Sequence, residues 1–184
     1  MFPSAINTPR TLLRKYHSED SATILKLLQA NRERLVSSFP ATYIKLSNVE
    51  KLGKWLEEEM PAAWENKQMY PLGLWHKQSG DYFGQVTLRN IDHSVRKAEL
   101  GYYLSQDYEG RGLMSEVLAS LIEVAFDELE LNRLYVRIML RNKRSVRLIE
   151  RCGFRYEGTL RQDFRSFFGN LEDVMIYGLL REEY

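Results

Sequence analysis

The sequence is poor in the residues that build disulfides and metal centres. Cys152 is the only cysteine among 184 residues, so neither an internal disulfide nor a site made of several thiolates can form. His17, His76 and His93 show no metal-ligand spacing. We therefore predict no metal, and the single free thiol fits a reducing cytoplasm.

Long apolar runs and an excess of charge are also missing. No stretch approaches the roughly 18 apolar residues that cross a bilayer, and residues 1–10 lack a basic segment followed by an apolar run. The net charge of +1 gives no bulk attraction to nucleic acid, and the length suits a single domain spanning residues 1–184. We expect a soluble protein with no membrane or direct nucleic-acid partner, whose specificity comes from a local site.

The hydrophobic pattern predicts a mixed sheet with helices packed on its faces. The clearest helix follows Gly112, where Met114, Val117 and Leu121 share one side. Aromatic and branched residues in the middle of the chain indicate an antiparallel meander. In chain order, we predict a strand at 12–15, helices at 24–35 and 49–60, strands at 72–75, 82–88 and 98–104, a helix at 113–125, a strand at 134–140, a helix at 142–152, and strands at 154–160 and 174–180.

Gly110 and Gly112 lie between a predicted strand and this helix. Glycines let backbone N–H groups converge on an anion without obstruction by Cβ, and a helix beginning at about Leu113 adds unpaired N–H groups and the positive end of its dipole. The pattern lacks the third glycine of a Rossmann fingerprint and the Gly-Lys-Ser/Thr ending of a P-loop. It predicts a phosphate site for another cofactor, or else only a tight strand-to-helix turn.

A set of five segments carries a family resemblance, and these segments are Arg10–Arg14, Ala98–Leu104, Glu109–Glu116, Asn142–Ser145 and Cys152–Arg161. In this order they resemble the GNAT acetyltransferases, and within them the RimJ/RimL type, which acetylates the N-terminal amines of ribosomal proteins. The resemblance runs through nearly the whole chain. One departure is visible, because the family usually has Gln or Arg three residues before the first turn glycine, where this chain has Asp107.

The resemblance implies the GNAT fold, a mixed, mostly antiparallel seven-stranded sheet of the α/β (α+β) class, flanked by about four helices and splayed between strands four and five. It implies acetyl-coenzyme A (acetyl-CoA) as cofactor, with its pyrophosphate on the amides of Glu109–Met114 and its pantetheine arm along Tyr103–Asp107. It also implies a β-bulge that frees a backbone N–H near Tyr103 to polarise the thioester carbonyl. The residues expected to bind the cofactor are Tyr102, Tyr103, Leu104, Gln106, Glu109, Gly110, Arg111, Gly112, Leu113, Met114, Asn142 and Arg144.

Acetyl transfer to an amine requires a base for the ammonium proton and a proton source for the leaving thiolate. Glu99 is the candidate base, because it alternates away from the core-like residues Ala98, Leu100 and Tyr102 and so faces the other side of the sheet. The alternative is a solvated glutamate paired with a neighbouring Lys or Arg.

Asn142 and Ser145 begin the short helix after the fifth strand of the resemblance, and Asn142 is suited to be its N-cap. In the family, the residue matching Asn142 binds the pantetheine. The residue matching Ser145 lies near the sulfur, where with a water it relays the proton to the thiolate. The resemblance therefore makes Ser145 the second catalytic candidate.

The same helix has a basic face made of Arg144, Arg147 and Arg151. This face is either solvated, or it brings Lys143 or Arg144 to the 3′-phosphate of coenzyme A, or it contacts ribosomal RNA. Cys152 is better explained as a small buried hydrophobe than as a nucleophile.

The acceptor amine is expected to enter between the first helix pair and the loop 161–170, with 31–40 as the opposing wall. Phe164, Phe167 and Phe168 in this loop either pack ordinarily or line the acceptor groove. The leading hypothesis is acetylation of a protein N-terminal amine, such as that of a ribosomal protein, by direct attack in a ternary complex. The alternatives are a small amine, such as a polyamine or an aminoglycoside-like compound, and a coenzyme-A-binding module without chemistry. Exposed edge strands could support a homodimer.

Overall fold

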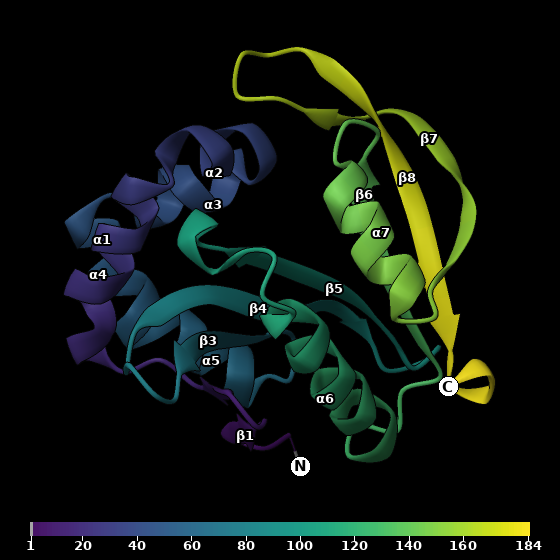
Figure 1. Ribbon diagram of the computed structural model, residues 1–184, viewed down its shortest axis with the longest axis horizontal. Coiled ribbons are helices and arrows are strands. Elements are labelled where there is room, and N and C mark those ends of the chain that lie inside the picture. Colours follow the sequence, from purple (N-terminus) through teal and green to yellow (C-terminus); the bar gives the residue numbers. More distant parts are fainter. Residues whose placement is uncertain (1) are drawn as a thin grey trace.

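The computed structural model describes residues 2–184, and within them the chain forms one eight-stranded sheet (Figure 1). The strand order is β1-β2-β3-β4-β5-β6-β8-β7, and every neighbouring pair is antiparallel except β5 and β6, which are parallel. The strands are β1 (Ala5–Asn7), β2 (Thr11–Arg14), β3 (Tyr70–His76), β4 (Tyr82–Asp92), β5 (Lys97–Leu104), β6 (Arg133–Met139), β7 (Arg155–Arg165) and β8 (Leu171–Leu180).

This mixed, mostly antiparallel sheet confirms the predicted fold class, with eight strands where seven were expected. The additional strand, β1, is three residues long, and only its middle residue, Ile6, is buried. So short a strand has no alternation for a sequence pattern to reveal.

The helices are more numerous than the four or so that were expected. Asn31 separates α1 from α2, because its side-chain oxygen accepts the N–H of Gln106 at 2.9 Å while its amide group donates to the Leu27 carbonyl at 3.0 Å. Pro40 then begins α3. The helices are α1 (Ser21–Ala30), α2 (Arg32–Ser38), α3 (Pro40–Leu46), α4 (Val49–Lys54), α5 (Met60–Glu65), α6 (Leu113–Asp127) and α7 (Lys143–Arg151).

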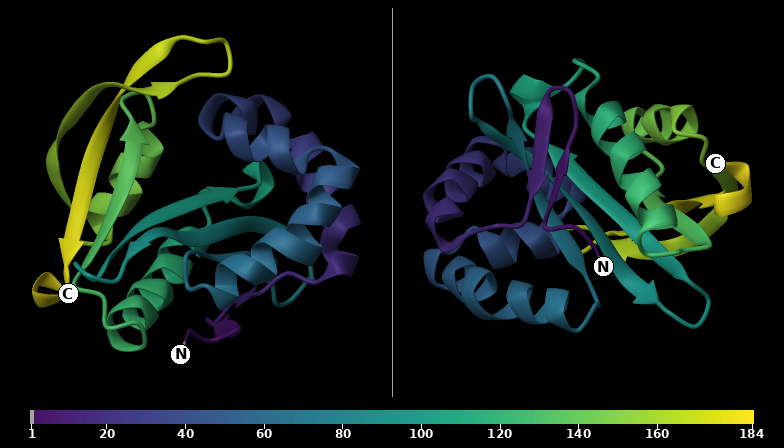
Figure 2. Two further views of the ribbon diagram at one scale, coloured as in Figure 1. Left: turned by 180° about the vertical axis from the view of Figure 1, so that it is seen from behind. Right: turned by 90° about the horizontal axis from the view of Figure 1, so that it is seen from below.

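Two apolar cores lie on opposite faces of the central strands. One core joins even-numbered residues of β4 and β5, such as Val86 and Leu100, to the apolar side of α6. The other joins Tyr103 to the N-terminal helices through residues such as Leu28 and Leu52. Figure 2 shows these helices on one side of the sheet and α6 on the other.

The parallel strands β5 and β6 diverge, as the resemblance implied. They pair over three register positions that end at Glu99 and Tyr135, although β5 continues to Leu104 and β6 to Met139. Figure 1 shows the two strands separating toward the ends that lie near α2 and α3. The second half of β5 therefore has an unpaired edge that a ligand can reach.

The expected β-bulge near Tyr103 is not there. Pairing of β4 with β5 is regular from Gly84 to Arg89, and its register shifts only between Arg89 and Asp92. Two residues, Asn90 and Ile91, oppose one residue of β5 at that point, and Asn90 has a φ of 51°. The bulge thus lies on the neighbouring strand, beside Glu99.

The free N–H groups nevertheless lie close to the predicted place. The N–H of Ser105 donates to the Phe83 carbonyl on β4 at 2.7 Å. Because backbone groups alternate along a strand, the N–H of Tyr103 also points toward β4, while those of Tyr102 and Leu104 point toward the diverging edge. The donors available to a ligand are therefore on either side of Tyr103.

Candidate active site

The turn before α6 has the geometry predicted for an anion site. Gly110 and Gly112 have φ values of 73° and 74°, which L side chains rarely adopt. Gly112 is the N-cap of α6 and has no side chain with which to cap it. The first N–H groups of this 15-residue helix are therefore available to an anion, supported by the helix dipole.

The turn is held in place by the loop between β1 and β2. Arg10 Nη1 donates to the Arg111 carbonyl at 2.9 Å, and Arg10 Nε donates to Glu116 Oε2 on α6 at 2.7 Å. Glu116 also accepts from the Arg10 backbone N–H at 2.8 Å and from the Thr8 hydroxyl. Two segments of the family resemblance, Arg10–Arg14 and Glu109–Glu116, are thus joined by one ionic contact.

We predict that Glu116→Gln destabilises the protein in a pH-dependent way. Burial favours the neutral acid, but hydrogen bonds from Thr8 and Arg10 outweigh it and hold the pKa of Glu116 below its ordinary value of 4.5. A carboxyl group whose pKa is lowered by folding stabilises the protein at pH values above its unfolded-state pKa. This stabilisation is lost as the pH falls through the pKa of the folded state. The expected cost at pH 7 is about 1–2 kcal/mol, near the low end for charged hydrogen bonds because Arg10 is half exposed.

Urea unfolding of both proteins between pH 7 and pH 3.5 tests this prediction. The difference in free energy of unfolding should shrink at the acid end of the series. Glu123→Gln changes an exposed glutamate on the same helix and serves as the matched control. A difference that stays constant across the series would show that the charge of Glu116 is not what anchors the turn.

Glu99 is buried and paired, not solvated. Its side chain is 2% exposed, with Oε1 accepting from Arg89 Nη2 at 2.6 Å and Oε2 accepting from Asn90 Nδ2 at 2.7 Å. Asn90 reaches the carboxylate from the bulge of β4. The alternative interpretation was right about an arginine partner and wrong about solvation.

The guanidinium of that arginine lies over a glycine of β5. A Cβ placed on Gly101 would be 3.8 Å from Arg89 Cζ, which is an ordinary van der Waals contact. Arg89 and Glu99 face the same side of the sheet as Gly101. These residues form one end of the cavity described below.

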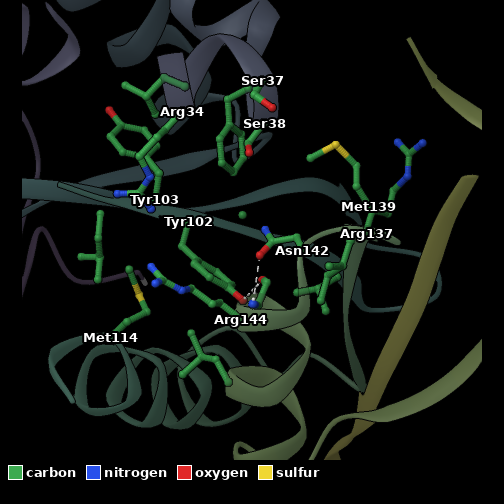
Figure 3. Close-up of a pocket in the computed structure, with 18 of the residues that line it drawn as sticks. Arg34, Ser37, Ser38, Tyr102, Tyr103, Met114, Arg137, Met139, Asn142 and Arg144 are labelled. Atoms are coloured by element: carbon green, nitrogen blue, oxygen red, sulfur yellow. Dashed lines mark hydrogen bonds between the residues drawn. The ribbon is translucent and has the colours of Figure 1, made fainter. Parts of the chain in front are cut away.

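Tyr102 and α7 meet across the diverging strands. The hydroxyl groups of Tyr102 and Ser145 are 2.5 Å apart, and Asn142 Oδ1 accepts from the Ser145 N–H at 3.1 Å, as predicted for an N-cap. In Figure 3, the Tyr102 ring points toward the end of α7 that carries Asn142. Burial raises the pKa of Tyr102 well above its ordinary value, so this phenol stays protonated at neutral pH.

A single cavity of about 1380 Å³ connects these parts. All the predicted site residues line it except Arg111, whose guanidinium lies 5.1 Å from the centre of the Tyr108 ring instead. The cavity extends from the turn at Gly110 to Glu99. The structure therefore brings together the proposed cofactor and catalytic residues, and it removes Arg111 from the wall of the site.

Several lining residues had not been singled out from the sequence. Arg141, at the end of β6, donates to the Ser37 hydroxyl on α2 and to Glu172 on β8, each at 2.8 Å. Phe164 lines the cavity, whereas Phe167 and Phe168 pack against each other at the exposed tip of the β7–β8 hairpin. Further lining residues include Arg34, Ser38, Arg89, Arg137, Met139, Arg165 and Val174.

Cys152 and the histidines take no part in this site. Burial raises the pKa of the Cys152 thiol, which keeps it protonated and a poor nucleophile. Residues 2–184 contain no group of three or more His, Cys, Asp or Glu side chains that could hold a metal ion. None of the helices described is both long enough and apolar enough to cross a membrane.

Diverging parallel strands, with an uncapped helix N-terminus beside them and a cavity lined by both, are the arrangement that the resemblance to acyl-coenzyme A transferases implied. The chain belongs to the acetyltransferase (GNAT) domain family, which matches residues 10–155.

Relatives of this chain include enzymes with different acceptors. A protein named "Putative ribosomal N-acetyltransferase YdaF", of Bacillus subtilis, is 33% identical over 153 residues, which are 76% of this chain and 83% of that protein. Escherichia coli spermidine N(1)-acetyltransferase is 28% identical over 127 residues, 64% of this chain and 68% of that protein. Mycobacterium smegmatis RimJ, solved in complex with CoA-disulfide, has the same fold, with a TM-score of 0.88 and 21% identity over 99% of this chain and 90% of that one.

The protein is therefore an N-acetyltransferase that uses acetyl-CoA, and its cavity fits that cofactor. The uncapped first turn of α6 and Arg144 on α7 suit the phosphates. The free N–H groups of Tyr102 and Leu104 suit the amide-bearing pantetheine arm, which can pair along β5 as an added strand would.

Proposed function

We propose that the enzyme acetylates the α-amine at the N-terminus of a protein, with ribosomal proteins as the first candidates, by direct attack in a ternary complex. The observation that carries the proposal is the continuity of the cavity. The same cavity that the proposed cofactor residues line is also lined by Ser37 and Pro40 from the N-terminal helices and by Phe164 from β7, which provides walls for an extended chain end. The likeness to the protein named as a putative ribosomal N-acetyltransferase supports the same acceptor class.

The charge of the cavity argues against a polyamine acceptor. Glu99 and Glu109 are the only acidic residues among those that line it, and each is already paired with arginine. A polyamine carries several positive charges and would need unpaired carboxylates to offset them. The lining arginines are Arg34, Arg89, Arg137, Arg141, Arg144, Arg147, Arg151 and Arg165.

In the proposed mechanism, Glu99 accepts the proton of the acceptor ammonium through a water molecule, because the carboxylate is too buried for direct contact. Of the two free N–H groups on β5, that of Leu104 pairs with the pantetheine arm, and that of Tyr102 is left to stabilise the negative charge that develops on the carbonyl oxygen. Ser145, hydrogen-bonded to Tyr102, relays a proton to the departing thiolate and takes one back from a water molecule, so that its hydroxyl is restored. Acetyl-CoA supplies the activated acyl group.

A peptide panel tests the acceptor. The protein is incubated with acetyl-CoA and peptides that differ in their first residue, alongside the same peptides with a blocked α-amine, and the products are mapped by mass spectrometry. Acetylation confined to free α-amines is the expected result. Acetylation of lysine side chains or spermidine alone would overturn the acceptor class. Binding of acetyl-CoA with no turnover on any amine would favour a module without chemistry.

We predict that Ser145→Ala lowers kcat roughly tenfold while coenzyme A affinity changes little. The loss is modest for a proton-transfer residue because water can replace a hydroxyl in part. Thiol release at saturating acetyl-CoA measures kcat, and calorimetry measures the affinity. Ser115→Ala, in the first turn of α6, removes another cavity hydroxyl and is expected to leave kcat unchanged. Equal effects of the two substitutions would eliminate the relay.

A further inference from the structure

A carboxylate in the phosphate turn is held between two arginines from opposite walls of the cavity. One oxygen of Glu109 accepts from Arg34 Nη2, on α2, and the other accepts from Arg144 Nη1, on α7. Glu109 immediately precedes Gly110. Figure 3 shows Arg34 and Arg144 among the residues that enter the cavity.

Arg34 has an unused donor at this place. Its Nη1 atom is buried and has no hydrogen-bond partner among residues 2–184, although 40% of the side chain as a whole is exposed. A buried guanidinium nitrogen without a partner costs free energy, so it indicates that a further acceptor atom belongs there. The side chain of Arg144, by contrast, is 75% exposed.

The surroundings indicate that this acceptor is an anion. The two arginines and Glu109 together carry a net charge of +1, and the uncapped first turn of α6 is next to them along the chain. Arg147 and Arg151 on α7 line the same cavity, and neither has a carboxylate partner among the ion pairs of the described residues. A phosphate group, which accepts several hydrogen bonds, matches the forked geometry of Arg34.

We propose that Arg34 binds a phosphate of coenzyme A and that Glu109 is an internal competitor for that phosphate. Without cofactor, the Glu109 carboxylate holds Arg34 and Arg144 over the turn. When cofactor binds, the partly exposed Arg34 side chain turns so that Nη1 donates to a phosphate, which shares both arginines with Glu109. Arg34 is thus a cofactor-binding residue supplied by the N-terminal helices, far in sequence from the glycine turn.

Calorimetric titration with coenzyme A, in the absence of any acceptor, tests this proposal. Arg34→Ala should weaken binding about tenfold, a typical loss for one hydrogen bond to a charged group. Arg32→Ala, which removes an exposed arginine of the same helix, should change binding less than twofold. Glu109→Gln should strengthen binding by roughly threefold to tenfold, because the competing charge is gone.

Pantetheine, which lacks the phosphates of coenzyme A, is the matched control ligand. The wild-type protein and Arg34→Ala should bind it equally, and an equal loss for both ligands would place Arg34 away from the phosphates. Weaker coenzyme A binding in Glu109→Gln would overturn the competition. Arg34→Gln provides a milder second variant, and thermal unfolding verifies that each variant is folded. Because no acceptor is present, these outcomes do not depend on which amine the enzyme acetylates.

Discussion

Glu99→Gln is expected to lower kcat/KM by a factor of about 100 to 1,000, while coenzyme A affinity stays unchanged. Glutamine keeps the size of the side chain but cannot accept the ammonium proton. The phosphates are proposed to bind at the glycine turn, and Gly110 and Glu99 line different parts of the cavity, so coenzyme A binding should not sense the change. Initial rates with a reactive peptide and calorimetric titration with coenzyme A measure the two quantities.

A structural role of Glu99 must be separated from a chemical one, because the substitution also breaks the ion pair with Arg89. The pH profile makes the distinction: loss of a base should remove the acid limb of kcat/KM, whereas loss of packing should lower the whole curve. Glu157→Gln breaks the ion pair with Arg133 outside the cavity and is the matched control. An unchanged rate across the pH range in Glu99→Gln would eliminate Glu99 as the base.

Local patterns predicted well the local structure of the glycine turn and of the start of α7. The glycine turn, the helix after it and the Asn142 cap each depend on residues close together in the sequence, where periodicity and capping rules apply. The proposed base could be placed on the correct face of its strand by alternation alone. What alternation could not supply was the partner, because Asn90 reaches Glu99 only through a bulge in β4.

The acceptor half was harder to predict because long-range contacts shape it. Asn31 ends α1 by accepting the Gln106 N–H, a contact between positions 75 residues apart. Arg141 joins α2 to β8 and owes its position in the cavity to both. Arg34 lies within the wall predicted at 31–40, yet nothing in its own segment identifies its partner, Glu109. Such residues acquire their roles from the tertiary structure.

Gly110→Ala is expected to weaken coenzyme A binding about tenfold to 100-fold, the second largest effect that we predict. Alanine at a φ of 73° is strained by roughly 1–2 kcal/mol, which shifts the turn away from the geometry that points its N–H groups at a phosphate. The added methyl group would also project from a residue that lines the cavity. Calorimetric titration measures the affinity, and urea unfolding measures the cost in stability.

Gly80→Ala is a closely matched control for this substitution. Gly80 has a φ of 74°, and, as at Gly110, no atom of the described residues lies within 4 Å of a Cβ built there. It lies between β3 and β4, away from the lining of the cavity. Both variants should therefore lose similar stability, but only Gly110→Ala should lose affinity. If Gly110→Ala retained full affinity for coenzyme A, as Gly80→Ala should, then Gly110 and Gly112 would serve only to turn the chain into α6. The phosphates would then have to bind elsewhere.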